Sequence, residues 1–255
     1  MGQLAALTTL RVFECRALTC LPESVGRLAA LTTLELGECD ALICLPESVG
    51  QLAALTTLGL GVCETLTCLP ESMGQLMALT TLVVFECEAL TCLPESLGQL
   101  TALKMLDFNS CQALTSLPES VGQLAALTTL TLIECGSLTH LPESLGQLAA
   151  LTTLNLASCH RLTCLPESIG QLAALTTLHL ASCTALPPAT SGWADSLLAA
   201  NHRFAEFRRR ELLLVSLGRR RTARGCYRLP PEMWLMVDTL LREGQRERFF
   251  DVNYY

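Results

Sequence analysis

The chain has few aromatic and few charged residues. Of its 255 residues, 5% are Phe, Trp or Tyr and 16% carry a charge, and Lys104 is its single lysine. A compact globular core usually draws more of its volume from aromatic side chains. Half of the residues are hydrophobic, so the composition favours a repetitive aliphatic core.

Long apolar segments are also missing. No run reaches the roughly 18–20 apolar residues that a membrane-spanning helix needs, and the N-terminus lacks the basic-then-apolar pattern of a signal peptide. Met1 and Gly2 begin a myristoylation motif, but Ala6 stands where that motif requires Ser or Thr. We therefore expect a cytoplasmic protein without a membrane span.

The net charge of −7 is unevenly distributed. Residues 1–186 contain 16 acidic and 5 basic residues, whereas residues 187–255 contain 8 acidic and 12 basic ones. An acidic body argues against nucleic acid as the main partner, because phosphate groups repel it. A protein partner is expected instead, with no small-molecule substrate, cofactor or metal.

The tetrapeptide LPES returns at a constant spacing of 24 residues. Its seven copies begin at Leu21, Leu45, Leu69, Leu93, Leu117, Leu141 and Leu165. The unit reads LPES-hydrophobic-GQLAALTTLxLxxCxxLTC, and a partial unit from Met1 precedes seven full ones. Such a period is typical of a solenoid, in which stacked repeats share one core. Residues 1–186 are predicted to form it.

Each unit predicts a short strand and a return segment. From Thr33 onward, alternation directs Leu34 and Leu36 inward. Strands that recur with a return segment between them pair in parallel. Pro22 suits the first position of a helical turn, and we expect Gly26 to end this turn with a positive φ.

The LTTLxLxxC segment has the LxxLxLxxN/C signature of leucine-rich repeats. Over residues 2–186 the unit resembles the repeats of plant intracellular disease-resistance receptors, and it is similar to Ras-group scaffold repeats. The resemblance implies an α/β fold: a curved right-handed horseshoe with a concave parallel sheet and short helical turns on the convex side. It also implies a protein–protein interaction module, a scaffold or recognition element in intracellular signalling or defence.

The cysteines follow the repeat. Eight occupy the strand-exit turn, where Asn is usual: Cys15, Cys39, Cys63, Cys87, Cys111, Cys135, Cys159 and Cys183. Five occupy a second position: Cys20, Cys44, Cys68, Cys92 and Cys164. The first set predicts a buried ladder of weakly hydrogen-bonding thiols, and CxxxxC is unlike the close pairs of zinc sites. Reduced structural thiols are expected, with oxidation or a redox or metal role as alternatives.

Differences between the repeats concentrate in two outward columns of the strands, which alternation places on the concave face. The first column is Arg11, Glu35, Gly59, Val83, Asp107, Thr131, Asn155 and His179. The second is Phe13, Gly37, Gly61, Phe85, Asn109, Ile133, Ala157 and Ala181. The residue types at exposed positions change by drift when nothing constrains them. The exposed glutamate of LPES nevertheless stays constant, so exposure alone does not explain the variation. We interpret the columns as a diversified partner-binding face, with drift as the alternative.

Three glycines, Gly37, Gly59 and Gly61, predict a shallow slot with Phe13 and Phe85 as aromatic walls. Acidic residues rim it: Glu14, Glu38, Asp40, Glu64, Glu86 and Glu88. The slot favours a basic partner with an apolar anchor; alternatively, the glycines only weaken the strands. The fourth full copy departs most, with Thr101, Lys104, Met105, Asp107, Asn109 and Gln112. It marks either a focal patch or an older copy.

The two ends of the array differ from its middle. The chain starts within a unit, which suggests a fragment of a longer array and an exposed sheet edge prone to self-association. Residues 187–255 predict an Arg-rich helical segment, a cap of the solenoid or a basic docking segment. Within it, residues 229–241 resemble the first helix of an F-box, which implies a substrate receptor docked to a ubiquitin-ligase adaptor.

Catalysis is not expected. An enzyme needs acid, base or nucleophile groups that converge, but the four histidines are scattered and no catalytic motif surrounds them. They are His140, His160, His179 and His202.

Overall fold

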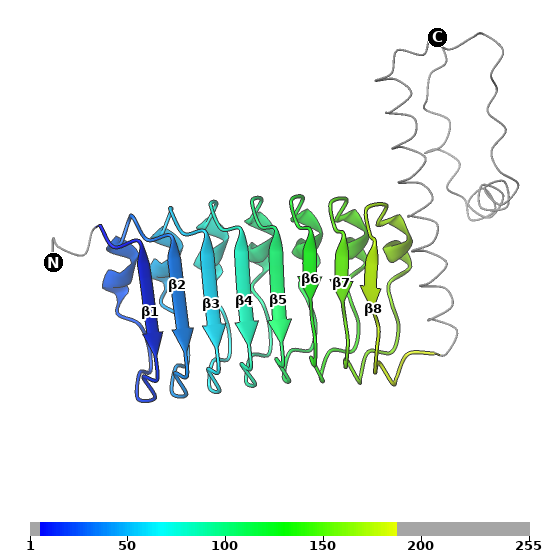
Figure 1. The fold of residues 1–255 in the computed structure, drawn as a ribbon, viewed down its shortest axis with the longest axis horizontal. Coiled ribbons are helices and arrows are strands. Elements are labelled where there is room, and N and C mark those ends of the chain that lie inside the picture. The colour runs from blue at the N-terminus through cyan, green and yellow to red at the C-terminus, as the bar shows by residue number, and fades with distance from the viewer. Residues whose placement is uncertain (1–5, 188–255) are drawn as a thin grey trace, which may run out of the picture. The chain divides into compact units, whose positions relative to one another are not determined.

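The structure, a computed structural model, describes residues 6–187. These residues form eight strands side by side in one parallel sheet, in the order of the chain (Figure 1). The strands are β1 (Thr9–Phe13), β2 (Thr33–Gly37), β3 (Thr57–Gly61), β4 (Thr81–Phe85), β5 (Met105–Asn109), β6 (Thr129–Thr131), β7 (Thr153–Asn155) and β8 (Thr177–His179). The predicted solenoid with a parallel sheet is confirmed.

Equivalent residues of successive repeats pair across the sheet. Leu34 of β2 aligns with Leu10 of β1 and with Leu58 of β3. Glu35 aligns with Arg11 on one side. Because the register step equals the repeat length, each position of the unit forms a column across the strands.

The inward positions of the strands build the core. Leu34 and Leu36 are buried, whereas Thr33 and Glu35 are half-buried, as the predicted alternation requires. Among the core residues that the structure describes, Phe108 of β5 is the one aromatic side chain. The core is therefore aliphatic, in agreement with the composition.

Short 3-10 helices cover one side of the sheet (Figure 1). They are η1 (Glu23–Arg27), η2 (Glu47–Gln51), η3 (Glu71–Gln75), η4 (Glu95–Gln99), η5 (Glu119–Gln123), η6 (Glu143–Gln147) and η7 (Glu167–Gln171). Each begins directly after the proline of LPES and carries its glutamate in the first turn. We call this the helix side, and the opposite surface of the sheet the open face.

The glycine of each 3-10 helix has a different role from the predicted one. Gly26 lies inside η1 and does not adopt a positive φ. A Cβ atom on Gly26 would collide with the backbone carbonyl oxygen of Ser48 in the next repeat, and one on Gly98 with that of Ser120. The prediction was wrong because glycine is needed here for the close approach of adjacent helices.

Positive φ angles lie instead directly after the strands. Glu38 and Val62 have φ values of 52° and 51°, and the equivalent residues of the other repeats are similar. The Glu38 amide donates a hydrogen bond of 3.0 Å to the Gly61 carbonyl oxygen of the next strand. This bond holds the turn in the left-handed region, although neither residue is glycine.

The constant glutamate of LPES joins one repeat to the next. The Glu47 carboxylate accepts a hydrogen bond of 3.1 Å from the Ser72 amide. Glu143 accepts one bond from the Ser168 amide and one from the Glu167 amide, and these bonds lower the pKa of the Glu143 carboxyl. Each carboxylate thus satisfies free N–H groups at the start of the next helix.

The cysteines of the strand-exit turn form the predicted ladder. All of them except Cys15 are buried. The Cys159 thiol donates to the Leu132 carbonyl oxygen at 2.9 Å, and the Cys183 thiol to that of Leu156 at 2.9 Å. Burial raises the pKa of Cys111 to about 11 and that of Cys159 to about 12, so these thiols are protonated at neutral pH. The thirteen cysteines within residues 6–187 are free.

Two predicted regions lie outside the described residues. The first is residues 1–5, the start of the first partial repeat. The second is the predicted C-terminal segment 187–255, of which only Pro187 is described, and it includes the F-box-like stretch 229–241. Their predicted roles stay predictions. Across residues 6–187, no helix combines the length and hydrophobicity that crossing a bilayer would take.

Candidate functional site

The two predicted outward columns lie along the open face. Their neighbours in the strands, such as Leu82 and Val84, are buried beneath the sheet. Ile133, Ala157 and Ala181 of the second column follow just after the shorter strands β6, β7 and β8. The structure therefore brings the predicted residues onto one continuous surface, while their role in binding stays a prediction.

The predicted slot is not open, because the two phenylalanines lie over the glycines. The Phe13 ring occupies the space that a Cβ atom on Gly37 would need, and the Phe85 ring does the same at Gly61. Gly37 and Gly61 are consequently buried and are themselves neighbours in β2 and β3. The side chains of Phe13 and Phe85 remain 52% and 42% exposed. The surface is an aromatic patch, not a slot with two walls.

Two charged residues of the first column neutralise each other. Arg11 Nε lies 2.8 Å from Glu35 Oε2, across the β1–β2 pair. The Glu35 methylene groups also lie beside Gly59, where they fill part of the space left by the missing side chain. Arg11 and Glu35 thus form a neutral pair within the first column.

Asp107 has no such partner. It lies in β5 between Val83 of β4 and Thr131 of β6. One of its carboxylate oxygens is buried without a hydrogen-bond partner, and burial raises the pKa of the Asp107 carboxyl. The two ion pairs found within residues 6–187, Arg11–Glu35 and Arg16–Asp40, leave Asp107 uncompensated.

Met105 is an open-face residue that the two columns missed. It starts β5, aligns with Thr81 and Thr129, and is 39% exposed. Because Met105 and Asp107 are two residues apart on one strand, they share the open face. The sequence contained a signal for this residue, since methionine replaces a threonine that all seven other repeats keep at this position.

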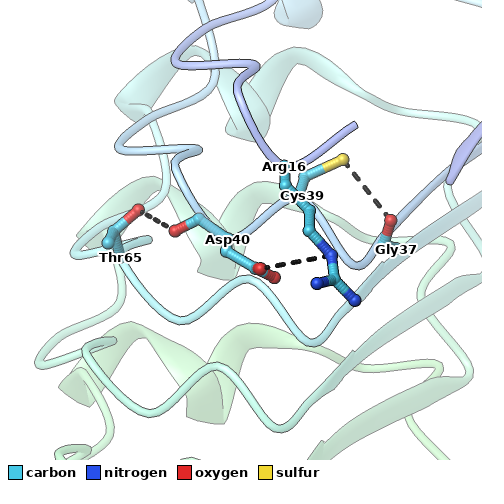
Figure 2. A network of polar contacts seen from close by, with 5 residues as sticks. All are labelled: Arg16, Gly37, Cys39, Asp40 and Thr65. Carbon is cyan, nitrogen blue, oxygen red and sulfur yellow. Dashed lines mark hydrogen bonds and ion pairs between the residues drawn. The ribbon is translucent and has the colours of Figure 1, made fainter. Parts of the chain in front are cut away.

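The acidic rim follows the strands and is tied to the turns by polar contacts (Figure 2). Arg16 Nε lies 3.7 Å from Asp40 Oδ2, and the Thr65 hydroxyl donates to the Asp40 carbonyl oxygen at 2.7 Å. In the same turn the Cys39 thiol donates to the Gly37 carbonyl oxygen at 3.4 Å. The rest of the rim is exposed: Glu14, Glu38, Glu64, Glu86 and Glu88.

The constancy of the LPES glutamate does not distinguish binding from drift, because that residue has a structural role between repeats. The Gln that ends each 3-10 helix from η2 to η7 is a better reference. It is exposed in all six helices and identical in all six. Exposed positions of the helix side thus vary less than the open face, although Arg27 replaces the Gln in η1 and Met77 and Thr101 each replace an alanine.

A hollow of about 360 Å³ lies on the segments that lead into η4, η5 and η6. It is lined by Cys92, Leu93, Glu95, Ser116, Leu117, Pro118, Glu119, His140 and Pro142. No group of three His, Cys, Asp or Glu side chains within residues 6–187 is arranged to hold a metal ion.

These features define a class of protein: a parallel sheet of aligned repeats, a 24-residue period and a leucine core. The chain is a leucine-rich-repeat protein. Residues 1–108 match the family model of a leucine-rich repeat region. Residues 99–213 match the leucine-rich repeats of RPS4B-like disease resistance proteins, so the repeats resemble those of plant resistance proteins. No curated protein matches the chain.

Solved structures with the same fold include the leucine-rich repeat domain of the type III effector XCV3220 (XopL). That domain is 26% identical, with a TM-score of 0.54 over 74% of this chain and 75% of that chain. A plant ice-binding protein is 22% identical, with a TM-score of 0.50 over 68% of this chain and 56% of that chain. The latter likeness concerns the fold alone.

Proposed function

We propose that residues 6–187 form a protein-binding module whose partner docks on the open face. One observation carries this proposal: among nearly identical repeats, variation is concentrated on the open face, where Phe13 and Phe85 are exposed. Exposed aromatic side chains near the centre of an interface contribute much of its binding energy. Membership of the leucine-rich-repeat family supports a binding role of this kind.

The partner that fits this surface is basic and has an apolar anchor. The aromatic patch offers an apolar contact, and the exposed carboxylates of the rim attract positive charge. The match of residues 99–213 to disease-resistance repeats supports a scaffold or recognition role in intracellular signalling or defence, in the cytoplasm. The role of the module in this proposal is binding and not catalysis, in keeping with the leucine-rich-repeat family.

An affinity capture with matched variants tests the proposal. The intact chain, the double variant F13A/F85A and the control M77A are used as baits for the same cell extract. Met77 is 57% exposed and lies two residues after η3, outside the open face. Proteins retained by the wild type and by M77A should be lost with F13A/F85A. Identical sets of proteins from all three baits would contradict binding through the open face.

A further inference from the structure

The carboxylate of Asp107 is an unsatisfied group in the middle of the open face. Its buried oxygen accepts no hydrogen bond. Its column neighbours Val83 and Thr131 carry no charge. A carboxylate that loses water without gaining a partner destabilises the folded state.

The fold does not need a carboxylate at this position. The same column holds Gly59, Val83, Thr131 and Asn155 in other repeats, and their strands keep the same register. An unfavourable residue on a surface that tolerates several favourable ones is typical of a functional site. A cation from outside the described residues can reach the other carboxylate oxygen, which is not buried, and would compensate the charge of Asp107.

The basic residues of the described chain do not supply this cation. Arg11 lies four strands away, roughly 19 Å at about 4.8 Å per strand, and is paired with Glu35. Lys104 directly precedes β5 but is exposed and takes no part in an ion pair. A single carboxylate is also too few ligands for a divalent cation.

The surroundings of Asp107 suit a cationic side chain with an apolar neighbour. Met105 precedes it on the same face of β5, and Phe85 aligns with Asn109, two residues further along. Apolar side chains beside a charge-assisted hydrogen bond exclude water and strengthen it. The exposed acids of the rim would bring positive charge to this face and repel phosphate groups.

We propose that Asp107 binds an Arg or Lys side chain of the protein partner, while an adjacent apolar side chain of the partner packs on Met105 and a separate apolar side chain contacts Phe85. This inference rests on the proposed function and specifies its partner: a segment in which a cationic and an apolar residue are neighbours. Asp107 is then the residue that selects for positive charge, and the aromatic patch supplies apolar contact.

A random-peptide display library, selected against the intact chain, provides a defined probe. Enriched peptides are synthesised, and their affinities are measured for the wild type, D107N, F85A and the control E167Q. Glu167 is an exposed carboxylate in η7, so E167Q removes the same charge away from the open face. Each peptide is also made with its Arg replaced by citrulline, or its Lys by norleucine, which removes the positive charge.

The enriched peptides should share an Arg or Lys next to an apolar residue. D107N should weaken their binding about tenfold or more, as expected for the loss of a charge-assisted hydrogen bond, whereas E167Q should not. The uncharged peptide should lose affinity for the wild type but not for D107N, because the two changes remove one interaction. Circular dichroism checks the folding of D107N. The variant D107T serves as a second test, because threonine occupies the equivalent position of the next repeat at Thr131.

Peptides without a cationic residue, or peptides that bind D107N as tightly as the wild type, would overturn the role of Asp107. If such peptides still lost affinity for F85A, the binding function of the open face would stand. Peptides indifferent to both D107N and F85A would overturn both proposals. A selection that enriches no peptide would count against both as well.

Discussion

At the scale of single residues, Asp107 places a partly buried negative charge on the open face, and this charge destabilises the folded state. Burial raises the pKa of its carboxyl above the value of about 3.9 for an unfolded aspartate. Between these two pKa values the folded state keeps a proton that the unfolded state releases. Stability therefore falls as the pH rises through this window, and the loss persists above it.

Replacing Asp107 with asparagine should therefore stabilise the protein at neutral pH. The free energy of unfolding of D107N should exceed that of the wild type at pH 7, and the difference should shrink as the pH falls below about 4, where the wild-type carboxyl becomes protonated in both states. Urea unfolding of both proteins from pH 3 to pH 7 measures the difference, in which other titrating groups cancel. A difference that is constant with pH would show that the ionised carboxylate carries no penalty.

At the scale of structural elements, the 3-10 helices set the distance between repeats. From η1 to η6, the glycine of each helix faces a serine of the next helix, and the LPES glutamate accepts a hydrogen bond from the amide of the same serine. The two contacts act on one junction, since the missing side chain allows the approach and the carboxylate satisfies the amide. The period of the solenoid thus depends on glycine and glutamate as well as on leucine.

A glycine in the middle of the array should tolerate no side chain. Gly98→Ala places a Cβ atom against the Ser120 carbonyl oxygen, and such overpacking should lower the free energy of unfolding by about 1–3 kcal/mol. Gly170→Ala is the matched control, because a Cβ atom on Gly170 meets nothing within 4 Å. Urea denaturation of both variants measures the effect. Equal stabilities of G98A and G170A would contradict the close-approach explanation.

The two sets of cysteines should differ in reactivity. The buried thiols donate to carbonyl groups, and burial raises the pKa of Cys111 to about 11, so its reactive thiolate is scarce. The thiols of Cys20, Cys68, Cys92 and Cys164 are exposed to the reagent, although desolvation raises the pKa of Cys20. Maleimide labelling of the native protein, followed by peptide mass spectrometry, should modify these four well before the buried set. Equally fast labelling of both sets would contradict a closed core.

At the scale of the whole molecule, the repeat made most of the architecture predictable. A strict 24-residue period assigns each residue to a column, so the burial of Leu34 and Leu36 and the outward direction of Glu35 follow from alternation alone. The cysteine ladder was predictable for the same reason, because a position repeated in every turn occupies one environment.

The errors and omissions concern distances between repeats, which the period does not contain. The predicted slot was wrong because the Phe13 ring lies over Gly37 and fills the space beside it. The repeat pattern does not contain the orientation of this ring. The role of Gly26 was misread because only the spacing of η1 and η2 shows the approach of Ser48. The missing hydrogen-bond partner of the buried Asp107 oxygen was likewise unpredictable, because it depends on which side chains of the adjacent strands come within hydrogen-bond distance.

Binding through the open face is the central claim, and three methionines report on it from different places. Met105 lies on the open face, Met77 lies in the turn after η3, outside the open face, and Met73 is buried in the core. A methyl-labelled sample is titrated with a peptide enriched by the intact chain, and the methionine methyl signals are followed by NMR. The account predicts that the Met105 signal shifts and that the Met77 signal does not. A shift of Met77 with an unchanged Met105 would contradict it.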